Sequence, residues 1–267
     1  MEGQIKSRAE ELMSLKNKKD NLIRITNIIK SNKALISEFW SNKNIKIFLL
    51  LEITGSLKDL ENLNEKSAEH IIIILKLIKE LCADVSVAND ILNMNYCAYL
   101  YFYLDFEDNS NLREEIRINT LLILSELVKH NLGFFLEELT ESDFVGSLLN
   151  IMDYGSLISI KLSFFIINII LKSKEGKDYF LKTHERISLL TTNIVKHLKE
   201  FMKFEKLAPT IIILDSLLEI INDPNVIKEL SVSMFGFLNN STISKFSEQN
   251  ISVQKKINLI ISILSKK

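Results

Sequence analysis

Five long apolar segments recur along the chain at nearly constant intervals. Aligned on one another, they place Leu81, Leu127, Ile170, Ile220 and Ile263 in register, with spacings of 46, 43, 50 and 43 residues. The segments read IILKLIKELCAD, NTLLILSELVKHN, LSFFIINIILKS, TIIILDSLLEIIND and KKINLIISILSKK. Such intervals are typical of armadillo and HEAT arrays, in which each unit buries its apolar face against its neighbours. The pattern predicts a helical repeat array, with an irregular helical bundle as the alternative.

Turn-forming residues are scarce, which favours helices over strands. The 267 residues include only seven glycines and two prolines. A β-sandwich or barrel of this length needs a turn roughly every 8–12 residues, and the chain lacks the residues to supply them. We therefore expect an all-α fold, in which the isoleucine-rich runs are buried helices despite the β propensity of isoleucine.

Shorter amphipathic segments lie between the long ones. They cover residues 85–93, 133–140, 142–152 and 176–183, so each unit contains one short and two longer helices. Three helices per unit favour armadillo over HEAT repeats. We predict a superhelical armadillo solenoid of about six repeats forming a single domain over residues 1–267. Residues 1–65 are the less regular part, residues 66–267 are the regular part, and residues 59–66 are the best linker candidate.

Composition and motifs argue against an enzyme. The net charge is -1, so any nucleic-acid binding would require a local basic patch. The chain has no glycine-rich phosphate-binding loop, and its four histidines lack metal-ligand spacing. Cys82 and Cys97 are expected to be free, buried thiols. The sequence thus predicts no catalytic residues, no metal and no cofactor.

The location of the protein is predicted from its hydropathy. The N-terminal residues mix acids and bases and lack the apolar core of a signal peptide. The longest apolar runs are far shorter than a membrane span. We therefore expect no membrane association and a location in the cytoplasm, with the nucleus as a second compartment.

One polar cluster, THERIS at residues 183–188, could suggest catalysis. Neighbouring residues of a helix point roughly 100° apart, so His184 and Glu185 cannot form a dyad on one face. Thr183 is instead expected to cap a helix that begins at the next residue. Two interpretations of Arg186 remain: an ion pair with Glu185 or with a neighbouring repeat, or a pocket lined by His184 and Arg186 for a partner side chain.

Several segments also resemble a known family. EEIRINTLLILSELVKHN, SLLNIMDYGSLISIKLSFFIINIIL and GKDYFLKTHERIS are similar to consecutive signatures of the Rcd family of cell-differentiation proteins, and LISEFWSNKNIKIFLLLEIT resembles the tryptophan-containing segment upstream. That family provides the armadillo subunit of the Ccr-Not mRNA deadenylase complex. The resemblance implies a non-catalytic adaptor in mRNA decay and translational repression.

The resemblance also implies three binding sites. The first binds a helical segment of the Not scaffold, and the second is a groove that accepts peptide helices from RNA-regulatory proteins. The third is a pocket for tryptophans of silencing proteins, where His184 and Arg186 stand at the family's Tyr and Arg. Carried over by position, the scaffold-binding residues are Trp40, Ser41, Lys43, Ile47 and Thr54, and the groove residues are Glu115, Arg117, Leu122 and Leu162.

Departures from the family pattern affect the groove most. The family has Tyr, Gly and Val where this chain has Glu115, Leu122 and Leu162, whereas Arg117 is retained. These changes predict a narrower groove of altered charge. The alternatives are a single-stranded nucleic-acid-binding armadillo protein and an unrelated armadillo scaffold. Self-association into a homodimer is a further expectation that the sequence leaves open.

Overall fold

A computed structural model describes residues 18–105, 110–230 and 246–265. These residues are helical or in turns and contain no strand, which confirms the all-α fold class. They form two compact units. Unit 1 comprises the described residues up to Phe134 together with Tyr154–Ser159, and unit 2 comprises Phe135–Asp153 and the described residues from Ile160 onward. Whether the chain is one continuous domain stays a prediction.

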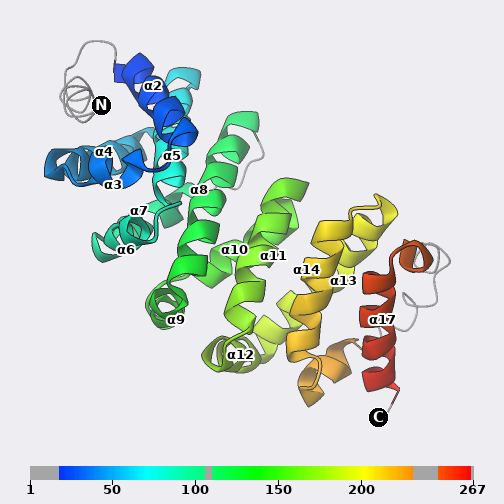
Figure 1. The fold of residues 1–267 in the computed structure, drawn as a ribbon. Coiled ribbons are helices and arrows are strands. Elements are labelled where there is room, and N and C mark those ends of the chain that lie inside the picture. Colours follow the sequence, from blue (N-terminus) through cyan, green and yellow to red (C-terminus); the bar gives the residue numbers. More distant parts are fainter. Residues whose placement is uncertain (1–17, 106–109, 231–245, 266–267) are drawn as a thin grey trace. The chain divides into compact units, whose positions relative to one another are not determined.

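Unit 1 is built around three helices that pack in sequence order. Helix α2 packs on α5, and α5 packs on α8 (Figure 1). The shorter helices α3, α4, α6 and α7 complete the unit. The bounds are α2 (Lys18–Ser31), α3 (Leu35–Trp40), α4 (Lys43–Ser56), η1 (Leu57–Asp59), α5 (Glu65–Leu81), α6 (Val85–Asn93), α7 (Tyr96–Leu100), η2 (Tyr101–Tyr103) and α8 (Asn111–His130).

Unit 2 repeats this mode of packing. Helix α13 packs on α14, and α14 packs on α17 (Figure 1). The unit also contains most of α9, α10 and α11. The bounds are α9 (Leu132–Glu141), α10 (Phe144–Tyr154), α11 (Leu157–Leu171), α12 (Lys174–Leu181), α13 (His184–Lys203), α14 (Leu207–Ile220) and α17 (Ile251–Leu264).

Side chains at the helix starts explain where several helices begin. Asn64 and Ser67 form a reciprocal capping box at α5, so the helix starts at Glu65, within the last residues of the predicted linker. Asp84 accepts hydrogen bonds from two backbone N–H groups at the start of α6. Such caps satisfy amide groups that the first helical turn leaves without partners. Residues 60–64, inside the predicted linker, are accordingly not helical.

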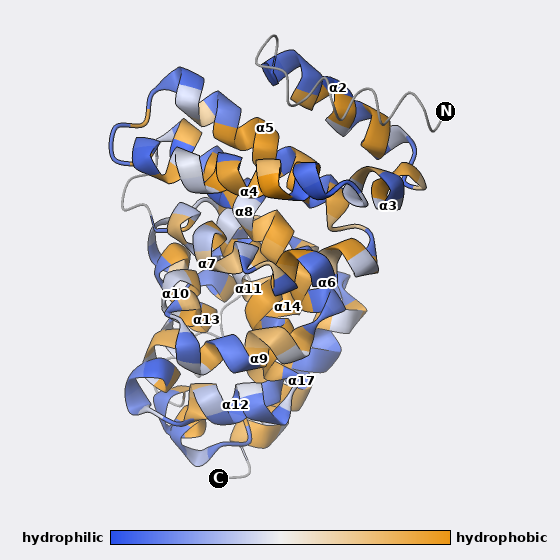
Figure 2. Ribbon diagram, turned by 90° about the vertical axis from the view of Figure 1, so that its left-hand side faces the viewer, coloured by the Kyte–Doolittle hydropathy of each residue, from blue (hydrophilic) through white to orange (hydrophobic). Residues whose placement is uncertain are grey.

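The core of each unit consists of the long helices that the sequence predicts. In α5, a run of isoleucines and leucines faces inward, and this helix is largely orange in Figure 2. Short α12, by contrast, is mostly hydrophilic. Its Gly176 lies against the end of α11, where an added Cβ would collide with the Ile170 carbonyl. Glycine therefore allows the close approach that fixes the position of α12.

The predicted segments and the observed helices agree in type and differ in length. The segment at 85–93 coincides with α6. Helices α5 and α8 start well before the apolar segments at 73–84 and 119–131, because their first turns are polar. The prediction of no signal peptide falls on residues 1–17, outside the described residues.

Candidate functional site

The polar cluster at 183–188 forms the first turn of α13. The Thr183 hydroxyl accepts a hydrogen bond from the backbone N–H of Arg186 at 3.4 Å, so the predicted N-cap is confirmed. The side chain of His184 is 71% exposed, and its Nε2 lies 3.6 Å from a carboxylate oxygen of Glu229. The ring of His184 therefore lies largely in solvent.

The Arg186 guanidinium is held by Tyr179 of α12. Its Nη1 donates to the Tyr179 carbonyl oxygen at 3.0 Å, and its Cζ lies 3.8 Å from the centroid of the Tyr179 ring. An arginine plane can stack on an aromatic face in this way, and the attraction is stronger where water is excluded. Gly176 and Thr183 fix α12 and the start of α13, respectively, and thereby fix this pair.

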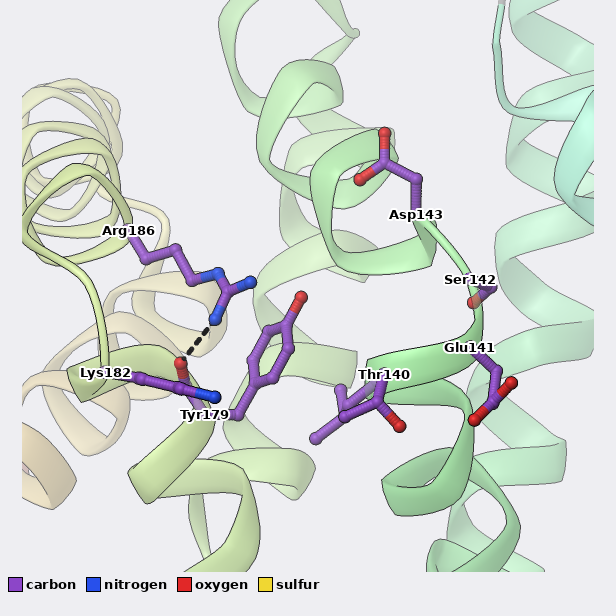
Figure 3. Close-up of a pocket in the computed structure, with 8 residues that line it drawn as sticks. Thr140, Glu141, Ser142, Asp143, Tyr179, Lys182 and Arg186 are labelled. Carbon is purple, nitrogen blue, oxygen red and sulfur yellow. Dashed lines mark hydrogen bonds between the residues drawn. The ribbon is translucent and has the colours of Figure 1, made fainter.

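A hollow of about 420 Å³ opens beside this pair, within unit 2 (Figure 3). Its volume is in the range of about 300–1,000 Å³ that ligand pockets occupy. Of the two residues predicted to line a pocket here, Arg186 does and His184 does not. The hollow is lined by Leu139, Thr140, Glu141, Ser142, Asp143, Tyr179, Lys182 and Arg186.

Sequence reasoning missed Tyr179. Its signal was weak, because Tyr179 lies seven residues before Arg186 and on a different helix. A half-exposed tyrosine on an otherwise hydrophilic short helix was the available indication. The aromatic ring that lies beside Arg186 in this chain is that of Tyr179.

A second candidate site is the outer face of α4 in unit 1. Ile47 is 43% exposed and Leu51 is 62% exposed. They are four residues apart, so they lie on one face of the helix together with exposed Lys43. We call Lys43, Ile47 and Leu51 the α4 strip. Leu51 was missed by sequence reasoning, although the four-residue helical interval from Ile47 indicates it.

The other three predicted scaffold-binding residues lie outside the α4 strip. Trp40 is only 3% exposed, and its Nε1 donates to Asp90 Oδ2 at 3.2 Å. The ring of Trp40 therefore lies in the interior of unit 1, and its contact with a partner stays a prediction. Ser41 is exposed at the end of α3, and half-buried Thr54 donates its hydroxyl to the Leu51 carbonyl at 3.2 Å.

Arg117, which is predicted to line the groove, has a fully buried side chain, and its contact with a peptide stays a prediction. Its guanidinium pairs with Glu114, donates through Nε to the Leu104 carbonyl at 3.4 Å and lies 5.0 Å from the Tyr154 ring centroid. Buried charges in proteins are paired and hydrogen-bonded because an isolated charge is costly. Arg117 is therefore a structural residue of unit 1.

Glu114 extends this network to the start of α11. It accepts hydrogen bonds from the Ser156 backbone N–H at 3.0 Å and from the Ser159 hydroxyl. Burial alone would raise the pKa of Glu114, but the bonds from Ser156 and Ser159 and the positive charge of Arg117 outweigh it and lower the pKa. The carboxylate is therefore held in its charged form.

The remaining groove residues are accessible. Glu115 is exposed and accepts from Lys76 Nζ at 2.8 Å, and Leu122 is half-buried seven residues further along α8. Leu162 is half-buried on α11 and belongs to unit 2. A hollow of about 310 Å³ with an apolar floor and a mixed-charge rim lies beside Glu115 in unit 1. It is lined by Lys19, Glu65, Glu69, Ile72, Ile73, Lys76, Leu112 and Glu115.

Other classes of site were sought among residues 18–105, 110–230 and 246–265. No group of three His, Cys, Asp or Glu side chains in these ranges could hold a metal ion. Within the same ranges, no helix has the length and apolar character needed to cross a membrane. Cys82 and Cys97 are buried thiols outside any disulfide, as expected, and burial raises the pKa of the Cys82 thiol well above its usual value.

Comparison with known proteins gives two findings. A family described as "Cell differentiation family, Rcd1-like" matches residues 9–264. The chain is also 22% identical over 202 residues to the cell differentiation protein rcd1 of Schizosaccharomyces pombe. The aligned region covers 74% of this chain and 71% of that protein. The family match spans nearly the whole sequence.

Proposed function

Because the chain belongs to the Rcd1-like cell differentiation family, we propose that it is a non-catalytic adaptor of the Ccr-Not mRNA deadenylase complex. In this role it binds a helix of the Not scaffold and recruits RNA-regulatory proteins through peptide or tryptophan-bearing segments. It acts in the cytoplasm and also in the nucleus. The resemblance of residues 35–54 and 82–188 to the family's signatures supports this assignment.

The adaptor proposal includes an armadillo solenoid as the architecture. Helices α5, α8, α11, α14 and α17 end within three residues of the five aligned positions Leu81, Leu127, Ile170, Ile220 and Ile263. Among the described residues, two α-helices lie between successive members of this series from α5 to α14, as expected of three-helix units. These features support the repeat interpretation in each unit.

The α4 strip is the single observation that carries scaffold binding. Two large aliphatic side chains are exposed one turn apart, at the place where the resemblance puts the scaffold-binding segment. An amphipathic helix binds such a strip by burying its own apolar residues against it. Full burial of the Leu51 side chain contributes roughly 1–2 kcal/mol, which corresponds to about a five- to thirtyfold change in affinity.

Co-expression with the helical segment of the cognate Not scaffold tests the proposal. We expect the wild-type chain to co-elute with this segment at micromolar concentration and Leu51→Glu to fail, because a carboxylate would be buried without a partner. Val85→Glu is the matched control, since Val85 is 53% exposed at the start of α6 and lies outside the strip. Failure of the wild type to co-elute would contradict the adaptor role, and co-elution of Leu51→Glu would contradict the assigned surface.

The hollow of about 420 Å³ beside Tyr179 and Arg186, here called the Arg186 hollow, supports tryptophan recruitment as the second part of the proposal. The guanidinium is stacked on Tyr179 by one face, within a pocket of ligand size. An incoming indole can stack on the exposed side of the same pair, which adds a cation–π contact to the burial of its ring.

A further inference from the structure

Charge is unevenly distributed around the Arg186 hollow. Lys182 and Arg186 lie on the wall formed by the end of α12 and the start of α13, whereas Glu141 and Asp143 lie on the opposite wall (Figure 3). The cationic wall also carries the Tyr179 ring. One side of the hollow is therefore positive and aromatic, and the other is acidic.

The two cations of this wall have no acidic partner among the described residues. Arg186 uses Nη1 for the Tyr179 carbonyl, which leaves other guanidinium N–H groups for a ligand. Lys182 is exposed. Other lysines of unit 2 are neutralised: Lys177 pairs with Glu219 at 2.6 Å, and Lys196 pairs with Asp153 at 3.0 Å.

Asp143 of the acidic wall faces the start of α10. Its carboxylate lies over the first turn of α10, where an added Cβ on Gly146 would collide with it. Carboxylates are stabilised in this position by the partial positive charge of a helix start. Glu141 is exposed like Asp143, and it lies outside that first turn.

We propose that this hollow selects an aromatic side chain whose neighbouring residue in the partner is Asp or Glu, with the neighbouring carboxylate binding Lys182 and Arg186. The inference rests on the proposed role of the hollow as a tryptophan pocket and specifies the partner's sequence. The ring stacks beside Tyr179 and Arg186, and the carboxylate accepts charge-assisted hydrogen bonds from the free N–H groups. Repulsion by the cationic wall disfavours a lysine or arginine in the same place.

Binding of short fluorophore-labelled peptides to the full chain tests this selectivity. Each peptide carries one tryptophan flanked by aspartate, serine or lysine, and anisotropy is measured because Trp40 gives the protein its own indole fluorescence. We expect the aspartate peptide to bind roughly three- to tenfold more tightly than the serine peptide at low salt, and the lysine peptide to bind most weakly. These differences should shrink as salt rises.

Two charge-neutralising substitutions in the same hollow form a matched pair. Lys182→Gln is expected to reduce the advantage of the aspartate peptide, whereas Glu141→Gln is expected to leave or increase it. Equal affinity for all three peptides would overturn the flank selectivity and leave the tryptophan pocket standing. Absence of binding by every tryptophan peptide would instead overturn the pocket itself. Loss of the flank preference in Glu141→Gln alone would assign the selectivity to the acidic wall and refute the proposed contacts.

Discussion

Arg117 in unit 1 and Arg186 in unit 2 both place a guanidinium against a tyrosine ring, yet their surroundings differ. Arg117 is fully buried, pairs with Glu114 and lies 5.0 Å from the Tyr154 ring. Arg186 is half-buried, has no acidic partner among the described residues and lies 3.8 Å from the Tyr179 ring. The same pair of side chains is a structural element where a carboxylate neutralises the charge, and it is our proposed binding surface where the charge is left accessible.

The largest expected effect comes from breaking the Arg117 pair. Arg117→Met should lower the free energy of unfolding by about 3–5 kcal/mol, because Glu114 would remain as a mostly buried charge without its cation. Urea unfolding monitored by far-UV circular dichroism measures this loss. The double variant Glu114→Gln with Arg117→Met should recover part of the stability. A loss below about 1 kcal/mol in the single variant would contradict the structural role of the pair.

Arg186→Ala should lower the affinity for a peptide and leave the stability of the protein nearly unchanged. We expect roughly a threefold to thirtyfold loss of affinity for a tryptophan peptide, because the stacked cation and its hydrogen bonds to the ligand disappear. The free energy of unfolding should change by less than about 1 kcal/mol, since Arg186 is half-buried and forms no ion pair within the described part of the chain. Peptide anisotropy and urea unfolding of the same preparation separate the two quantities. A large destabilisation with unchanged peptide affinity would make Arg186 a structural residue like Arg117.

Tyr179 offers a finer test of the stacked arrangement. Tyr179→Leu should weaken tryptophan-peptide binding by about two- to tenfold, because the guanidinium loses the ring that orients it. Tyr179→Phe keeps the ring and the backbone carbonyl that accepts from Arg186, so it should bind like the wild type. Equal weakening in both variants would show that the hydroxyl, and not the ring, is what the ligand needs.

The sequence predicted the helices better than it predicted which side chains are accessible. Segment 85–93 matches α6, and Thr183 caps α13, because periodicity and capping are local properties. Trp40 is buried beside Asp90 and Arg117 beside Tyr154, both far along the chain, and position within a family motif does not reveal such contacts. Tyr179 reaches Arg186 only because Gly176 brings α12 against α11.

The smallest expected effect is a pH dependence of stability, for which a group in unit 2 and a group in unit 1 act in different pH ranges. His197 in unit 2 is buried, and its Nε2–H donates to the Met152 carbonyl at 2.6 Å. Burial lowers the pKa of His197 from its ordinary value of 6.5 and outweighs the opposing effects of Met152 and Glu200. The unfolded chain therefore takes up this proton first, so stability is fully present above pH 6.5 and falls as the pH drops toward the folded-state pKa.

Glu114 in unit 1 affects stability at a lower pH than His197 does, because its pKa is lowered from an ordinary value of 4.5. Its contribution persists until the pH falls below about 4.5 and is then lost as the carboxylate becomes protonated. Urea unfolding at about pH 7.5 and 5.5 should therefore show a decrease that His197→Gln reduces and Glu114→Gln does not. His184→Gln is the control, because this histidine is exposed. An undiminished decrease in His197→Gln would mean that other groups titrate in the upper pH range, and the buried histidine would have no part in the pH dependence.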